Sequence, residues 1–157
     1  NIKFFSGAVM CPLPHFEGHR SKTKANDWLE GRTLSFLVDI ERNGSIVYRI
    51  FIQSSSTHYP DGMPPASLLA KRPVDLAIPG VASYHFSEAT YPCNYLRALN
   101  AKHVMYIHWE DFFRNYKRKP KSVLATDIPR FFKCVASQCD VSGYILPAPG
   151  VVTTIQY

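Results

Sequence analysis

Apolar and polar residues alternate most strictly over residues 33–41, which predicts a β-strand with one buried face. Asn43-Gly44 then provides a two-residue turn that accepts positive φ, and residues 46–53 return as an apolar partner strand. We therefore expect an antiparallel hairpin. The apolar positions on the predicted inner face of its first strand are Leu34, Phe36, Val38 and Ile40.

Two later apolar runs, residues 74–78 and 103–107, are short and continuous, as in strands that are covered on both faces. Residues 91–99 lie between them and carry apolar side chains at helical spacing. A strand, a helix and a second strand in this order predict two parallel strands of one sheet, joined by a right-handed crossover.

The rest of the chain adds shorter elements. We expect strands over residues 3–10, 143–146 and 151–157, a short helix over 66–71, and at most a helical turn within 21–31. Another helix is predicted to start at residues 126–129, capped by Asp127 or Thr126, with Pro129 in its first turn. Its apolar face would carry Phe131, Phe132 and Val135.

Strands come first and then alternate with helices, which predicts an α/β fold with a mixed β-sheet covered by helices. A length of 157 residues corresponds to one domain spanning residues 1–157. The composition, 46% hydrophobic and 13% aromatic, is that of a chain that folds around a core rather than a disordered chain.

The net charge of +6 favours anionic partners, although most charges are spread along the chain. One dense basic run covers residues 114–121. We expect this run to be a solvated helix end, and the alternative is nucleic-acid binding in which Tyr116 adds a stacking surface.

The four cysteines, Cys11, Cys93, Cys134 and Cys139, lack a Cys-x-x-Cys pair, so neither a zinc ribbon nor a dense disulfide scaffold is indicated. Cys134 and Cys139 can pair only if the helix between them ends. The sequence contains no apolar run of transmembrane length and no visible signal peptide. It starts at Asn1 within strand-like sequence, so we expect the protein's own start to lie upstream.

His108 follows the predicted strand 103–107, at the kind of strand end where binding sites collect. His15 and His19 lie in a loop rich in proline and glycine that follows the strand over 3–10, and such a loop can aim an imidazole at a metal ion. The alternatives are that His108 is a structural histidine and that His15 and His19 are exposed loop residues.

The segment 108–113, His-Trp-Glu-Asp-Phe-Phe, resembles the H-W-D-D-F-F sequence near the end of a branch of the metallo-β-lactamase-fold hydrolases. Three upstream segments, 35–38, 50–55 and 74–78, resemble the same family in the same order, so the resemblance covers roughly residues 5–135. It implies a four-layer αββα sandwich of which this chain is the second half. The family's first-half His-x-His-x-Asp-His cluster does not occur within residues 1–157.

The resemblance also implies a set of metal ligands. His15 matches the family's loop histidine, with His19 as the alternative, and His108 is the second ligand. Ser54 stands where binuclear members have a bridging aspartate. Because a serine hydroxyl is a weak ligand, we expect one divalent ion, zinc, rather than two.

Three further residues are candidates for the surroundings of that site. Asp111 is expected to cap a helix after His108 or to hold an imidazole through a hydrogen bond. His58 could compensate for Ser54, and His85 could contact substrate, although a solvated or structural role is the simpler expectation for both.

The expected function is metal-dependent hydrolysis of an ester, amide or phosphoester bond in a small molecule, with this chain supplying part of the active site. The alternatives are a non-catalytic module that keeps the fold, and the nucleic-acid-binding module described above. As partners we expect the missing N-terminal half, a partner chain or a second copy, and no membrane. Phe36, Val38 and Phe51 would form the apolar patch that drives this association.

Overall fold

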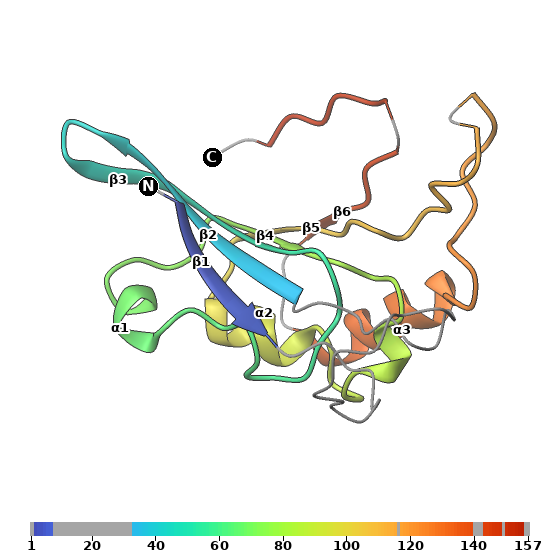
Figure 1. Cartoon of the computed structure of the whole chain (residues 1–157), viewed down its shortest axis with the longest axis horizontal. Helices are drawn as coiled ribbons and strands as arrows, with labels where there is room; N and C mark the ends of the chain where they lie inside the picture. The colour runs from blue at the N-terminus through green and yellow to red at the C-terminus, as the bar shows by residue number, and fades with distance from the viewer. Residues whose placement is uncertain (1, 8–32, 116, 140–142, 149, 156–157) are drawn as a thin grey trace, which may run out of the picture.

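The protein is described by a computed structural model that covers residues 2–7, 33–115, 117–139, 143–148 and 150–155. Its framework is a six-stranded sheet whose strands lie side by side in chain order, as Figure 1 shows. The strands are β1 (Ile2–Gly7), β2 (Thr33–Arg42), β3 (Ser45–Gln53), β4 (Leu76–Pro79), β5 (His103–Met105) and β6 (Tyr144–Ile145). The helices are α1 (Ala66–Leu69), the 3-10 turn η2 (Tyr84–Phe86), α2 (Cys93–Leu99) and α3 (Ile128–Gln138).

The predicted hairpin is confirmed. Strands β2 and β3 pair antiparallel, and β1 pairs antiparallel with β2 on the outer edge. The connecting turn has positive φ at both central residues, 53° at Asn43 and 76° at Gly44, as a two-residue turn between twisted strands requires.

The predicted parallel pair is confirmed as well. Strands β4 and β5 run parallel in one sheet with α2 between them in the chain, and β3 and β6 extend the parallel part on either side. The sheet is therefore mixed and carries helices, which confirms the predicted fold class. Helix α3 begins as expected, because the Asp127 side chain accepts a hydrogen bond from the backbone N–H of Arg130 at 3.0 Å. The expected strand over 151–157 is wrong for residues 151–155, which form no regular structure.

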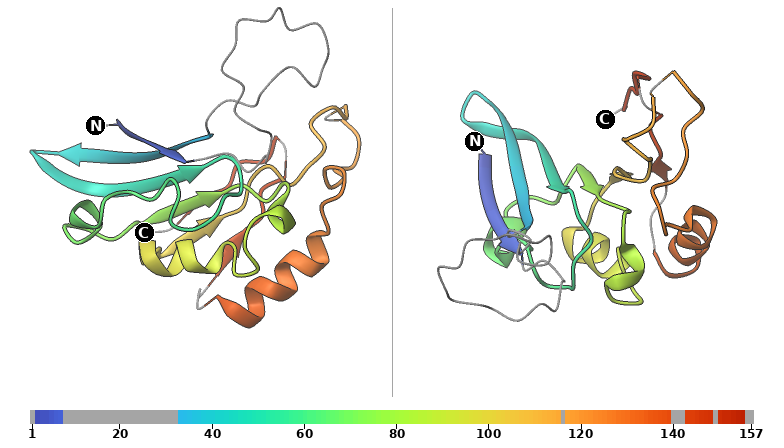
Figure 2. Two further views of the ribbon diagram at one scale, coloured as in Figure 1. Left: turned by 60° about the horizontal axis from the view of Figure 1, so that its bottom comes forward. Right: turned by 45° about the vertical axis from the view of Figure 1, so that its right-hand side comes forward.

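All three α-helices lie on one side of the sheet (Figures 1 and 2). The core between helices and sheet is built around buried residues such as Leu37, Phe51, Val104, Tyr106 and Phe131. In β2, Leu37 is the apolar residue on this covered face, so the assignment of Leu34, Phe36, Val38 and Ile40 to the inner face is wrong. Phe51, expected in an exposed patch, is buried against the helices as well.

The covered face of the hairpin is partly polar, which explains this error. Arg49 is fully buried and donates to both carboxylate oxygens of Asp39, at 2.6 and 2.9 Å. Its Nη1 also donates to the carbonyls of Leu68 and Arg72, at 2.6 and 2.7 Å. Because the guanidinium and carboxylate are paired and hydrogen-bonded, they can occupy the inner face in place of apolar residues.

Asp75 extends this polar network at the start of β4. Burial raises the pKa of its carboxyl, but hydrogen bonds from Lys102, Arg72 and the Arg49 backbone N–H outweigh burial, so the pKa is lowered. The ionised carboxylate therefore joins the beginning of β4 to β3 and β5.

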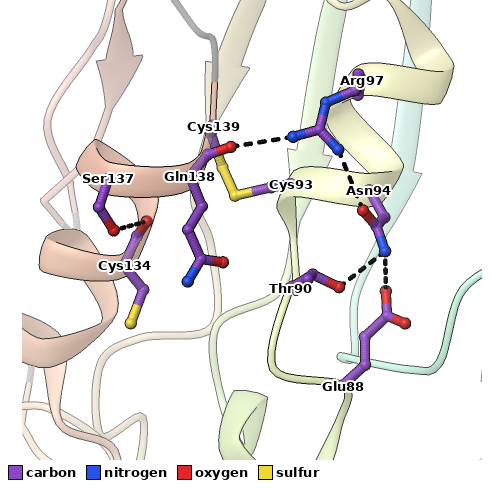
Figure 3. Close-up of a disulfide and its surroundings, with 9 residues drawn as sticks. All are labelled: Glu88, Thr90, Cys93, Asn94, Arg97, Cys134, Ser137, Gln138 and Cys139. Carbon is purple, nitrogen blue, oxygen red and sulfur yellow. Dashed lines mark hydrogen bonds between the residues drawn. A yellow bond between two sulfur atoms is a disulfide. The ribbon is translucent and has the colours of Figure 1, made fainter.

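A disulfide between Cys93 and Cys139 joins the first residue of α2 to the residue that follows α3, as Figure 3 shows. Arg97 adds a hydrogen bond from Nη2 to the Gln138 carbonyl at 3.1 Å. Because α3 continues to Gln138, Cys134 does not pair with Cys139, and its side chain points away from the disulfide in Figure 3. No helix in the described part of the chain is both long and apolar enough to cross a membrane.

Candidate functional site

The carboxyl ends of β3, β4 and β5 meet at one edge of the sheet. The backbone N–H of Gly80, directly after β4, donates to the Gln53 carbonyl of β3 at 2.7 Å. Two residues further on, the N–H of Ala82 donates to the His108 carbonyl at 3.0 Å. These bonds hold the three strand ends together, so side chains that follow them are presented from a rigid base.

Gly80 allows the chain after β4 to lie very close to the backbone of Ser54, which follows β3. A Cβ atom at position 80 would lie 2.2 Å from the Ser54 carbonyl oxygen, so only glycine fits without a shift of backbone. The buried Tyr91 hydroxyl donates to the Gly80 carbonyl at 2.6 Å. Burial, with Tyr95 and Tyr106 nearby, raises the pKa of Tyr91 well above its usual value, so the hydroxyl keeps the proton it donates.

His108 follows β5 and the short pairing of Ile107 with Gly80. Its backbone is left-handed, with φ of 55°, and its ring Nδ1 lies 3.1 Å from the Ser54 carbonyl oxygen. A carbonyl oxygen can only accept, so Nδ1 is the donor in this hydrogen bond. In the neutral ring, Nε2 then carries the free lone pair, which is the arrangement of a metal-ligating or proton-accepting histidine.

Ser54 and Asp111 were both expected near the His108 ring, and the structure gives them different contacts. The Ser54 residue is exposed and orients the imidazole through its backbone carbonyl rather than through its hydroxyl. Asp111 accepts a hydrogen bond from the Phe113 N–H at 3.1 Å. The prediction that Asp111 lies at a helix start is wrong, because residues 112 and 113 form a turn, which the Asp111 side chain stabilises.

His58 and His85 have local contacts of their own. The carbonyl of His58 accepts from the buried Tyr95 hydroxyl at 2.5 Å, which ties the β3–α1 connection to α2. His85 is exposed in η2, and its ring centroid lies 4.1 Å from that of Phe86. These contacts give both residues a structural explanation, and a role in the site stays a prediction for each.

His15 and His19 lie outside the described residues, so their predicted approach to His108 stays a prediction. In the described part of the chain, no group of three histidine, cysteine, aspartate or glutamate residues could hold a metal ion. A catalytic zinc usually has three protein ligands. The chemistry of His108 fits one such ligand, and the described residues alone do not make a metal site.

Two features of this edge were missed by the sequence reasoning. The sequence predicts Tyr91 only as part of the helix over residues 91–99, and it predicts no role for Gly80. The Pro-Gly pair directly after an apolar strand was the available signal for a close backbone approach. The hydrogen bond from Tyr91 joins residues that are eleven positions apart, so no local sequence pattern predicts it.

Comparisons with known proteins give only distant similarity. No family model and no curated protein matches the chain. Among solved structures, it is similar to a candidate Zn-dependent hydrolase of the metallo-β-lactamase superfamily from Thermotoga maritima, at 14% sequence identity and a TM-score of 0.44. The match covers 76% of this chain and 60% of that one, so the chain spans less than two thirds of that protein. A similarity at this level carries no argument about activity.

Proposed function

We propose that this chain is the second sheet-and-helix half of a metal-dependent hydrolase of the metallo-β-lactamase type, and that it supplies His108 to the active site. The observation that carries the proposal is the position of His108 at the meeting point of three parallel strand ends. There the Ser54 carbonyl holds Nδ1 and leaves Nε2 available. The ordered resemblance of segments 35–38, 50–55, 74–78 and 108–113 to that family supports the same assignment.

The face of the hairpin opposite the helices is a second support. Cross-strand pairs on this face are Phe36 with Ile52, Val38 with Ile50, and Ile40 with Tyr48. None of these six residues is fully buried, and Ile40 is 48% exposed. An apolar sheet face of this kind is usually covered by another layer, as when two sheets pack face to face. In the proposed αββα sandwich, the covering layer is the sheet of the other half.

The chemistry proposed for the complete site is hydrolysis of an ester, amide or phosphoester in a small molecule. A divalent ion, when bound, lowers the pKa of water and polarises the bond to be cleaved. Ser54 in place of an aspartate favours a single ion, and histidine ligands are compatible with zinc. The remaining ligands would come from outside the described residues, with His15 as the first candidate and His19 as its alternative.

Within this proposal, the described residues have orienting roles. His108 is the ligand, and the Ser54 carbonyl fixes the direction of its ring. Gly80 allows β3 and β4 to approach so closely that the Ser54 carbonyl can reach that ring. The site therefore depends on backbone geometry as much as on the side chain of His108.

The test is a His108→Ala variant of the complete protein, compared with the wild type and with His103→Ala. His103 is a matched control because it is the first residue of β5, whereas His108 follows the carboxyl end of that strand. We expect His108→Ala to lose bound metal and hydrolysis of an ester, amide and phosphoester panel together, with unchanged circular dichroism. His103→Ala should keep both properties.

Loss of folding with metal retained in His108→Ala would show that the histidine is structural. A wild-type protein that binds no metal and hydrolyses none of the panel would favour the second candidate, a non-catalytic module. The replacement of the family's aspartate by Ser54 is the observation that supports this second candidate.

A further inference from the structure

Residues 109–115 and 117–123 belong to a loop that projects from the sheet beyond His108, drawn in orange in Figures 1 and 2. Its base is closed by the pairing of Glu110 with Ser122, and the Val123 N–H donates to the Trp109 carbonyl at 2.9 Å. The expected solvated helix end is wrong for the described residues of this run, which contain no helix. Tyr116 lies outside the described residues.

The loop carries much of the chain's positive charge. Its five cations and two carboxylates give it a net charge of +3, half of the +6 of the whole chain. The cations are Arg114, Lys117, Arg118, Lys119 and Lys121. Apart from the half-buried Arg114, all of them are exposed, so the loop presents a concentrated site for anionic groups.

Two phenyl rings are exposed between this charge and His108. Phe112 is 62% exposed and Phe113 is 89% exposed, and their ring centroids lie 4.5 Å apart. The ring centroid of Phe112 also lies 5.9 Å from that of His108. Large apolar side chains in adjacent exposed positions provide a surface on which a planar ring can stack.

A hollow of about 210 Å³ opens beside Phe112 and is also lined by Glu110, Arg114 and Arg118. This volume is below the range of about 300–1,000 Å³ found for pockets that enclose a drug-sized ligand, so the hollow suits one chemical group. Glu110 Oε2 and Arg114 Nε are buried, and neither has a hydrogen-bond partner among the described residues.

We propose that this loop binds nucleotide units, so that the substrate of the hydrolase carries at least one nucleotide. The base would stack on Phe112 or Phe113, beside the hollow. The phosphates would follow the exposed cations. The statement that the bound nucleotide is the substrate rests on the proposed hydrolase function. Nucleotide binding by the loop does not, because binding does not require catalysis.

The placement of the aromatic pair favours this ligand over a membrane surface. A loop that inserts into a membrane carries its apolar side chains where they enter the bilayer first, whereas here Phe112 and Phe113 lie near His108 and the outer part of the loop is cationic. Aromatic rings next to cations are the combination that binds single-stranded nucleic acid.

Binding is measured by fluorescence anisotropy on the complete protein, with a labelled single-stranded dT12 as the probe. An abasic 12-mer of the same charge tests the need for the rings, and competition by unlabelled adenosine monophosphate distinguishes a free nucleotide from a strand. Vesicles that contain phosphatidylserine form a separate arm. We expect dT12 to bind at least about tenfold more tightly than the abasic strand, since each stacked base contributes about 1–3 kcal/mol.

The aromatic variant is Phe112→Ala/Phe113→Ala, and its control is Phe86→Ala, because Phe86 is 61% exposed on η2. We expect the double variant to bind dT12 at least about tenfold more weakly and the control to match the wild type. Circular dichroism checks that both variants are folded. Equal binding by the double variant and the control would overturn the proposal.

The charge variant is Lys119→Gln/Lys121→Gln, with Lys71→Gln/Lys133→Gln as an exposed control pair on the helix side. Each phosphate contact to a single strand contributes about 0.7 to the slope of log K against log salt. The loop variant should therefore flatten this slope by about 1.4, and the control pair should leave it unchanged.

No dT12 binding, equal affinity for the abasic strand, or binding to vesicles alone would each overturn the nucleotide assignment. These outcomes are distinguishable from failure of the hydrolase proposal. A metal-containing wild type that hydrolyses a simple ester but binds no nucleotide refutes only the present inference. A metal-free protein that binds dT12 refutes only the proposed function.

Discussion

Replacing Gly80 with alanine would test the backbone geometry of the site. The added Cβ would lie 2.2 Å from the Ser54 carbonyl oxygen, whereas real Cβ contacts essentially never fall below 3.0 Å. The carbonyl or β4 must therefore move by about 0.8 Å, the difference between these two distances. Crowding of this kind in a packed interior costs about 1–3 kcal/mol. The same movement displaces the acceptor of the His108 Nδ1 hydrogen bond.

The matched control is Gly143→Ala, because a Cβ at position 143 meets nothing within 4 Å. Urea denaturation should show a loss of about 1–3 kcal/mol for Gly80→Ala and less than about 0.5 kcal/mol for the control. Metal titration of the complete protein should show weaker binding only in Gly80→Ala. Equal stability of the two variants would refute the close-approach argument, and lost stability with unchanged metal affinity would show that this contact does not orient His108.

Three further predictions concern stability and association. Reduction of the Cys93–Cys139 disulfide, which spans 46 residues, should lower the free energy of unfolding by about 4 kcal/mol in the chain-entropy model. Urea denaturation with and without dithiothreitol checks this, and a Cys134→Ser variant should respond like the wild type. Because folding lowers the pKa of Asp75, the ionised carboxylate stabilises the fold at pH values above the unfolded pKa near 3.9. This stabilisation is lost as the pH falls through the folded pKa. In denaturation curves measured across acid pH, Asp75→Asn should therefore show a weaker pH dependence than the wild type. The chain by itself should self-associate in sedimentation experiments. Ile40→Lys should reduce this association, because Ile40 is exposed on the apolar face of the hairpin. A folded wild-type monomer that is stable on dilution would contradict the half-sandwich proposal.

Local signals predicted most of the fold correctly. The Asn43-Gly44 turn predicts the hairpin, and the cap residue Asp127, with Pro129 in the first turn, predicts the start of α3. Both features involve residues within a few positions of one another, so the sequence alone contains the information. The same applies to the parallel pair, which follows from a helix between two apolar runs.

Features that depend on distant contacts could not be predicted in this way. Alternation in β2 distinguishes two faces, but it does not say which face the helices cover. The simple expectation that the more apolar face is covered fails here, because the paired Asp39 and Arg49 are buried on the face that the helices cover. The partner of Cys139 is Cys93 rather than the nearby Cys134, because α3 continues between the two close cysteines. The candidate His108 follows from its position after a predicted strand. The close approach at Gly80 depends on Ser54, which is distant in the sequence, so no local pattern predicts it.

The central claim is that His108 binds a metal ion. X-ray absorption at the zinc edge of the zinc-loaded complete protein measures this directly, in the wild type, His108→Ala and His103→Ala. We predict imidazole nitrogen at about 2.0–2.1 Å from zinc in the wild type and in His103→Ala, with one imidazole fewer in His108→Ala. An identical imidazole count in all three proteins would contradict it.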